Sequence, residues 1–217
     1  MQEKIDEIRK LTKLEVNSFQ FSKTAKIPFK VHSFIEIMNI RMLDFCESTN
    51  LLLETNHVIP ALSTLRVILE NVAISNRIAL AVKNTIKSGQ LPENFDDLIS
   101  KINFGTRYND EYQAINILTQ IEKLNKEYPV TENFYEALSE FVHPNWDGVQ
   151  GSYSELVESK NKMELRKIIT NTHDLMNWIN ACFDLCLVLH LEIHNDLLKK
   201  LPEFATICET DIIKTKP

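Results

Sequence analysis

Apolar residues recur every three or four positions along most of this chain, and that spacing predicts α-helices. The first predicted helix places Ile5, Ile8, Leu11 and Leu14 on one face, and a polar connector that contains Pro28 follows it. The full set of predicted helices is 2–17, 33–54, 60–88, 92–102, 110–128, 131–142 and a long last helix from about 161 to 201.

Proline, glycine and capping residues indicate where these helices begin and end. Pro60 suits a first helical turn and Gly89 suits the position after a last one, so they frame the third helix. Thr131 is the expected cap of the helix that follows Pro129. That helix should stop at His143, because Pro144 disfavours the α conformation in the residue before it. Asn161, with Glu164 three residues later, resembles a capping pair that opens the last helix.

Composition supports a helical fold class. The chain has 217 residues, of which 44% are hydrophobic, and it contains only four glycines and seven prolines. Because folds made of strands need frequent turn residues, this scarcity favours an all-α protein. We expect a single domain over residues 1–217 with its core at about 33–201 and a loose tail from about 210.

Charge and cysteine spacing limit the function classes. The formal net charge is −6, so the whole surface does not attract nucleic acid, although local basic groups could. The two candidates are the sets Lys23, Lys26, Lys30, His32 and Lys160, Lys162, Arg166, Lys167. The four cysteines lack the paired spacing of metal sites and are expected to be small buried hydrophobic residues. No export signal or membrane span is indicated, so we expect a cytoplasmic protein with no membrane association, metal or cofactor.

The third predicted helix and the turn after His143 carry the first candidate site. Arg66 and Glu70 are four residues apart and form a polar line on an otherwise apolar helix. They are either an internal ion pair or a guanidinium that a carboxylate aims at a phosphate. His143 stands at a helix C-terminus beside Asn145, where it is either a catalytic group or a cap of the helix.

Two histidine patterns on the last predicted helix give further candidates. Arg166 and His173 are seven residues apart, so they should project from one side of that helix together with Thr170. His190 and His194 have a zinc-like spacing, but Leu191 stands where a metalloprotease needs glutamate. We therefore expect a core histidine bonded to a polar partner, with the Arg66 and Glu70 line as the candidate.

The segments Leu65-Arg66-Val67-Ile68-Leu69-Glu70 and Leu138-Ser139-Glu140-Phe141-Val142-His143-Pro144-Asn145 together resemble a group of bacterial all-helical proteins. Their fold is similar to the HEPN (higher eukaryotes and prokaryotes nucleotide-binding) superfamily. The resemblance implies a bundle of four to five long helices with short accessory helices, a homo-oligomer such as a dimer, and a role in bacterial defence or stress. In active members it also implies metal-independent RNA cleavage by an arginine that precedes a histidine by four to six intervening residues. That pattern is absent before His143 and is present in Arg166 and His173.

Three function classes therefore remain open. In a ribonuclease, His143 would take the proton from a ribose 2′-hydroxyl and Arg66 would stabilise the charge on the phosphate. Glu70 would orient the guanidinium, and Asn145 would bond a phosphate oxygen. In a non-catalytic interaction module with a protein partner, Arg66, Glu70 and His143 would form a buried structural network. A binding site for a small ligand would need a pocket beside His143 lined by Trp146, Tyr153 and Arg66.

Overall fold

The chain folds into an all-α structure with one small hairpin. The computed structural model describes residues 2–106, 108, 111–169 and 172–215, without the side chains of 160, 214 and 215. Its helices are α1 (Gln2–Leu11), α2 (Ile27–Glu54), α3 (Val58–Ser88), α4 (Phe95–Phe104), α5 (Ile117–Glu127), α6 (Thr131–Val142), α7 (Gly151–Tyr153) and α8 (His173–Thr215). The strands β1 (Ser154–Val157) and β2 (Lys162–Leu165) pair antiparallel. The predicted all-α class is thus confirmed.

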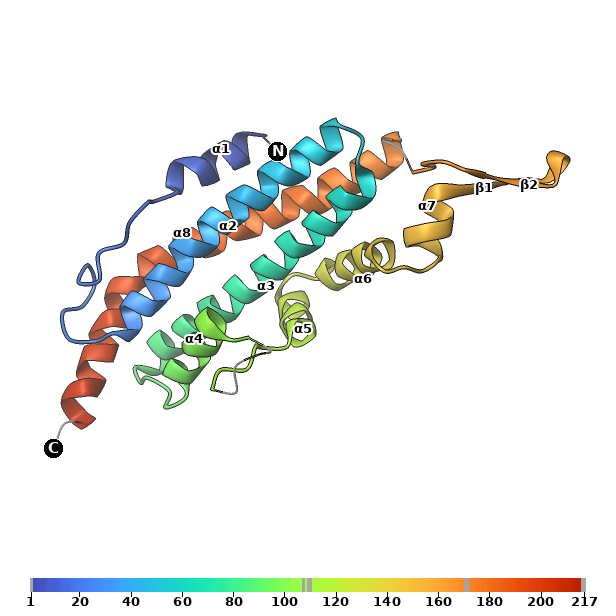
Figure 1. Ribbon diagram of the computed structural model, residues 1–217. Coiled ribbons are helices and arrows are strands. Elements are labelled where there is room, and N and C mark those ends of the chain that lie inside the picture. The colour runs from blue at the N-terminus through green and yellow to red at the C-terminus, as the bar shows by residue number, and fades with distance from the viewer. Residues whose placement is uncertain (1, 107, 109–110, 170–171, 216–217) are drawn as a thin grey trace.

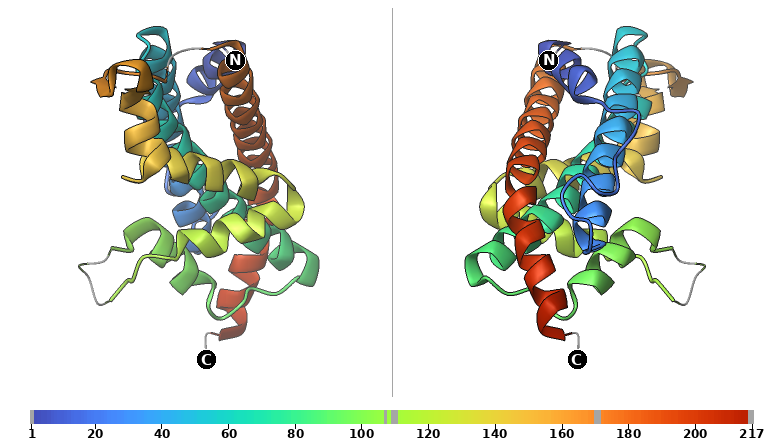
Figure 2. Two further views of the ribbon diagram at one scale, coloured as in Figure 1. Left: turned by 90° about the vertical axis from the view of Figure 1, so that its right-hand side faces the viewer. Right: turned by 90° about the vertical axis from the view of Figure 1, so that its left-hand side faces the viewer.

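Three long helices form the body of the protein. Helices α2, α3 and α8 run beside one another and pack together, as the views in Figures 1 and 2 show. Helix α1 covers α2 and α8, whereas α5 and α6 lie across α3. In the described part of the chain, the long helices therefore number three rather than four to five. Helix α3 is central, as its broad apolar surface predicts, with Leu62, Leu65, Ile68, Leu69 and Val72 fully buried.

Several helix ends follow the sequence signals. Gly89 ends α3 in a left-handed conformation with φ of 66°, which costs glycine less than other residues. Helix α6 ends at Val142, and His143 is extended with φ of −73° and ψ of 148°. Gly89 and Pro144 thus mark helix ends as local steric rules require. Helix α3 begins at Val58, two residues before the predicted start at Pro60, which lies in its first turn.

Other predicted ends were wrong because capping chemistry or packing decided differently. Helix α1 stops at Leu11, which leaves Leu14 exposed, and α2 begins early enough to include Pro28 in its first turn. Helix α5 starts only at Ile117, where Asn116 accepts a hydrogen bond from the backbone of Leu118; the predicted start at Asp110 lies outside the described residues. Thr131 is not a cap, because its hydroxyl donates to the carbonyl of Tyr128.

The segment predicted as the start of the last helix is a β-hairpin instead. Asn161 adopts a left-handed conformation (φ 46°, ψ 44°) at its tip, a conformation that asparagine tolerates in turns, and it does not cap a helix. Helix α8 begins only at His173. At its other end α8 continues through Pro202 to Thr215, so the expected end near 201 was wrong. Residues 210–215 of the expected loose tail are helical, and residues 216–217 lie outside the described residues. Buried Phe204, Ala205 and Cys208 hold this last part against the core.

The burial of apolar side chains follows the hydrophobic pattern of the sequence. All four cysteines are free and buried, as predicted. Two helices, Val58–Ser88 and His173–Ile213, are long and apolar enough to cross a membrane by composition alone. However, 56% and 50% of their most apolar windows are buried inside the protein, as in the core helices of soluble proteins.

Candidate functional site

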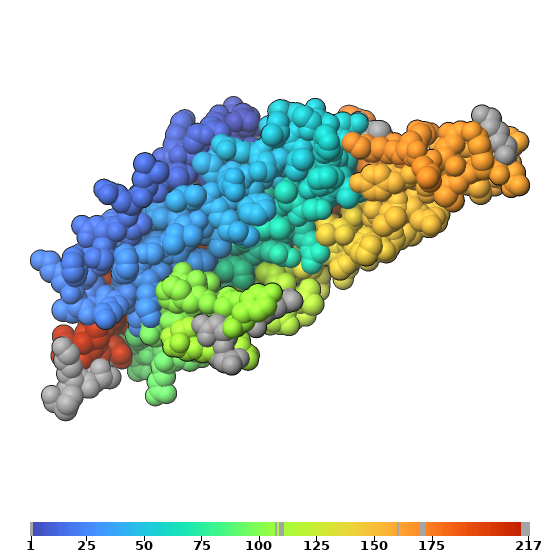
Figure 3. All heavy atoms as spheres, in the orientation of Figure 1, coloured from blue at the N-terminus to red at the C-terminus, as the bar shows by residue number. Residues whose placement is uncertain are grey.

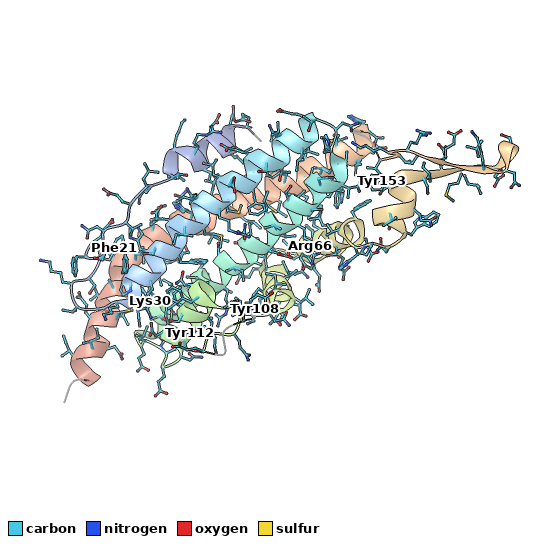
Figure 4. All side chains as sticks on the ribbon, in the orientation of Figure 1. Phe21, Lys30, Arg66, Tyr108, Tyr112 and Tyr153 are labelled. Atoms are coloured by element: carbon cyan, nitrogen blue, oxygen red, sulfur yellow. The ribbon has the colours of Figure 1, made fainter. Side chains whose placement is uncertain are left out.

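An open groove between α3, α5 and α6 contains the two main candidate residues. It has a volume of about 760 Å³ and is lined by Arg66 of α3 and by His143 at the end of α6. Ile117, Leu118 and Ile121 of α5 provide an apolar side. Arg66 lies on α3, the central helix, on which α6 packs (Figure 4). Two segments more than seventy residues apart in the sequence thus meet at one concave surface.

Arg66 is held by side chains of its own protein. Its Nη2 donates a hydrogen bond of 2.8 Å to the hydroxyl of Tyr135, whose ring lies 4.9 Å from the guanidinium carbon. The Tyr135 hydroxyl donates in turn to Glu70 Oε1 at 3.1 Å. Arg66 Nε lies 3.3 Å from the same oxygen, close enough for an ion pair but not aligned as a hydrogen bond. We call this triangle of Arg66, Glu70 and Tyr135 the arginine network.

The arginine network joins α3 to α6 in a half-buried position. The side chains of Arg66 and Glu70 are 22% and 26% exposed, and Tyr135 is buried. Burial raises the pKa of the Tyr135 hydroxyl by more than the hydrogen bond from Arg66 lowers it, and the neighbouring Glu70 raises it further. Tyr135 therefore stays protonated near neutral pH and can donate to Glu70. Sequence reasoning missed Tyr135, because its partners are more than sixty positions away.

His143 lies on the groove but outside the arginine network. It is exposed, and its backbone closes α6 through a bond from its amide to the carbonyl of Ser139. Its carbonyl accepts from Asn145 and lies against Gly148, where an added Cβ would approach to 2.0 Å. Gly148 is thus required for this tight turn. The idea that Arg66, Glu70 and His143 form one buried network does not fit, because His143 is exposed and Tyr135 takes that place.

Asn145 shapes the turn after α6. Its Oδ1 accepts a hydrogen bond of 3.0 Å from the Gly148 amide, and its Nδ2 donates to Glu140. It thereby caps the π-helical turn Trp146–Gln150. Asn145 is not among the residues that line the groove, so its contacts are those of a local structural residue.

The charge of the groove is mainly negative. Its basic side chains are those of Arg66 and His143. Four carboxylates also line it, and they belong to Glu122, Glu132, Glu136 and Glu140. The last three are four residues apart along α6, so they form one row on the helix surface, where like charges repel. The spacing of these three glutamates can be read from the sequence. The sequence does not show that they line a groove, so it did not indicate a site.

The alternative catalytic pair does not share a helix. Arg166 follows β2 and pairs with Glu155 of β1, whereas His173 is the first residue of α8 and bonds Asn177 at 3.0 Å. The prediction that they project from one helix face was therefore wrong, because Arg166 lies at the base of the hairpin and α8 begins only at His173. Thr170, placed beside them in the prediction, lies outside the described residues. Tyr153 lines a separate small pocket, so Trp146 and Tyr153 do not build a site with Arg66 as expected.

The proposed basic sets are largely engaged or dispersed. His32 is buried, and Lys30 pairs with Asp96. Lys162 pairs with Glu164, and Lys167 donates to the carbonyl of Asn56. The side chain of Lys160 lies outside the described residues. These contacts leave less charge for a phosphate backbone than the sequence suggested.

A second polar cluster lies deep between α2 and α8. His32, Glu36, Asn39, His190 and His194 are each at most 2% exposed. Lys13 contacts Glu36 Oε1 at 2.7 Å, and His32 and His194 lie 3.3 and 3.9 Å from the same carboxylate. His190 Nε2 lies 2.9 Å from Asn39 Oδ1. The predicted core histidine is thus bonded to a polar partner, but that partner comes from α2 and not from Arg66 or Glu70.

The protonation of this buried cluster follows from its contacts. Asn39 Nδ2 already donates to the Ile8 carbonyl and to Thr12, so Asn39 Oδ1 must accept from His190 Nε2. Burial, with a smaller effect of His194, lowers the pKa of His190 to about 3. Burial alone would raise the pKa of Glu36, but the neighbouring His194, His32 and Lys13 hold it well below its usual range. In the described part of the chain, no three His, Cys, Asp or Glu side chains are arranged to hold a metal ion.

Comparisons with protein-family models, with curated proteins and with solved structures found no match for this chain.

Proposed function

We propose that this protein is a non-catalytic helical interaction module whose groove between α3, α5 and α6 binds a cationic segment of a partner protein. The observation that carries the proposal is the lining of the groove. Four carboxylates face two basic side chains, and one of these, Arg66, is already paired with Glu70. An anionic ligand would therefore meet net repulsion, whereas lysine and arginine side chains would meet attraction.

The apolar side of the groove defines the rest of the partner segment. Leu118 is 54% exposed beside Ile117 and Ile121, and Glu136 lies on the opposing helix α6. A segment that carries basic residues on one side and a leucine or similar residue on the other would satisfy both walls. Amphipathic helices dock in grooves in this way, with apolar anchors for affinity and charges for orientation.

The binding test uses a short basic amphipathic peptide labelled with a fluorophore. Fluorescence anisotropy should report binding that weakens as salt is added, because exposed charges are screened. Changing Glu122→Gln and Glu136→Gln together should weaken binding by about three- to tenfold, since each exposed pair contributes roughly 0.2–1 kcal/mol. The matched control is Glu203→Gln, an exposed glutamate on α8 outside the groove. Equal affinity of both variants would refute the groove as the binding site.

A second candidate function is metal-independent RNA cleavage in a HEPN-like role in bacterial defence or stress, in the cytoplasm. One observation favours it, namely that Arg66 and His143 line the same open groove. Here His143 would act as the base and Arg66 would have to leave Glu70 and Tyr135 to reach a phosphate. Bacteria that express the wild-type chain would then stop growing and lose intact RNA, and His143→Ala would restore both. Harmless expression with intact RNA leaves the interaction module as the function.

A further inference from the structure

The hairpin forms an arm that projects from the helical body. Strands β1 and β2 extend away from α6 and α8 in Figure 1, and the space-filling view in Figure 3 shows the same protrusion. Two backbone bonds continue the ribbon at its base, from Arg166 to Tyr153 and from Ile168 to Ser152. Each strand has four residues. A two-stranded ribbon of this size is only marginally stable in water by itself. Packing against another surface would stabilise it.

The two faces of the arm differ in chemistry. Residues directly opposite in an antiparallel pair share a face, and alternate residues along a strand share it too. The register pairs Ser154 with Leu165 and Leu156 with Met163. One face therefore carries Leu156, Met163 and Leu165, which are 61%, 50% and 80% exposed. We call it the apolar arm face.

The opposite face is charged and balanced. Glu155 stands opposite Glu164, a repulsive arrangement, but Arg166 pairs with Glu155 and Lys162 pairs with Glu164. These ion pairs lie within the arm and balance the charges of Glu155 and Glu164 on its two strands. The paired charges of the strands therefore offer a charged partner little to bind. The apolar arm face, in contrast, is exposed to solvent.

We propose that the arm is a dimerisation element, in which the apolar arm face packs against the same face of a second copy of this chain. The occupant follows from symmetry and area. A two-fold axis that passes beside the Leu156 and Met163 pair would bring the apolar arm faces of two chains together. Each chain would then contribute the same surface, as an isologous interface requires. An uncharged apolar face is complementary to itself, whereas a charged face of one sign would not be.

Two further exposed apolar side chains precede the arm in the chain. Trp146 and Val149 lie on the turn that leads into the arm and are 69% and 45% exposed. Three ribbon side chains alone fall short of a specific interface, but a tryptophan ring adds on the order of 150–250 Å² when buried. Two copies that join these five side chains would cover an area near the lower end of specific interfaces, about 1,200 Å² in total. The dimer should therefore be weak, with a dissociation constant in the micromolar range.

Single cysteines on the two arm faces test this arrangement. All four native cysteines are buried, so an added surface thiol is the accessible one within the described residues. Met163→Cys places it on the apolar arm face, and Glu155→Cys places it on the charged face as the matched control. A bismaleimide, which joins two thiols by adding each across one of its double bonds, should link Met163→Cys into covalent dimers and leave Glu155→Cys monomeric. Equal yields from the two variants would overturn the proposed arrangement.

Sedimentation velocity gives the independent readout. The wild-type chain should shift from monomer to dimer across the micromolar range. Changing Leu156→Asp and Leu165→Asp together should keep it monomeric, with an unchanged circular dichroism spectrum because the arm lies outside the core. Glu155→Gln with Glu164→Gln should still dimerise. A wild-type monomer at every concentration, or a dimer that survives both aspartates, refutes the proposal. The monomeric variant should still bind the basic peptide, so this proposal and the groove proposal can fail separately.

Discussion

Two polar clusters interrupt the hydrophobic core, and they differ in their access to water. The cluster around Glu36 lies between α2 and α8 with every histidine and carboxylate at most 2% exposed. The arginine network lies between α3 and α6 and borders the groove, with the side chains of Arg66 and Glu70 22% and 26% exposed. A sealed cluster can only fix the packing of the helices around it. A cluster at the edge of a groove can also shape a binding surface, so the two should respond differently to substitution.

The largest expected effect is the loss of charge at Glu36. Glu36→Gln removes the partner of Lys13 and of two buried histidines, and breaking a buried ion pair costs roughly 3–5 kcal/mol. Because Lys13 reaches solvent, we expect about 3 kcal/mol, the lower end of that range. Urea denaturation measures the free energy of unfolding. Glu203→Gln should stay within about 0.5 kcal/mol of the wild type. A loss below about 1 kcal/mol at Glu36 would show that the cluster does not fix the packing.

Acid should unfold the protein through the same cluster. His190 binds a proton at about pH 3 when folded but near 6.5 when unfolded, so unfolding takes up a proton between these values. Stability should fall as the pH falls from 6.5 toward 3, with a slope approaching about 1.4 kcal/mol per pH unit from this group. Glu36, whose folded pKa is also lowered, adds a further loss below its unfolded pKa of 4.5.

The titration has its own control variant. His190→Gln can keep the bond to Asn39 while it removes the titrating ring. The stability of this variant, measured by denaturation at a series of pH values, should flatten between pH 6.5 and 4.5, where Glu36 does not yet contribute. His194, His32 and Lys13 also face Glu36 in this cluster, and an unchanged slope would show that His190 is not the source of the acid sensitivity.

A smaller effect is expected at the arginine network. Tyr135→Phe removes the hydroxyl that bridges Arg66 and Glu70 but keeps the ring under the guanidinium. The loss of these hydrogen bonds should cost about 1–2 kcal/mol, because water can reach part of the network. Thermal and urea unfolding would measure it. A cost as large as that of Glu36→Gln would remove the contrast between the two clusters.

The smallest expected effect is at His143. This side chain is exposed and outside the arginine network, so His143→Ala should change the free energy of unfolding by less than about 0.5 kcal/mol. Arg66→Ala, measured beside it, should cost more, because Glu70 and Tyr135 lose their shared partner. A clear destabilisation by His143→Ala would show that the His143 side chain stabilises the fold.

Local signals in the sequence predicted much of the fold. The helical spacing of apolar residues predicted the positions of α2, α3, α6 and most of α8. Gly89 and Pro144 correctly predicted where α3 and α6 end. The hairpin was missed because Asn161 and Glu164 fit a helix cap as well as a turn. The choice depends on the pairing of β1 with β2 across the turn, which the helical spacing of single residues does not reveal.

The candidate site was predicted in part. Arg66 and Glu70 follow from helical spacing, and the position of His143 follows from Pro144. Tyr135, and the partnership of His190 with Asn39, depend on which helices become neighbours. The acidic character of the groove likewise arises only when α5 and α6 bring their glutamates beside Arg66. Tertiary neighbours, rather than residue types, decide these contacts.

The most direct test of the central claim is a paired titration of the wild-type protein. Fluorescence anisotropy would compare a labelled basic amphipathic peptide with a labelled single-stranded RNA, at the same ionic strength and with gel analysis of the RNA afterwards. The acidic groove predicts that the peptide binds, in a manner that depends on Glu122 and Glu136, and that the RNA neither binds nor breaks. Tight RNA binding with cleavage that disappears in Arg66→Ala and His143→Ala, together with no peptide binding, would contradict it.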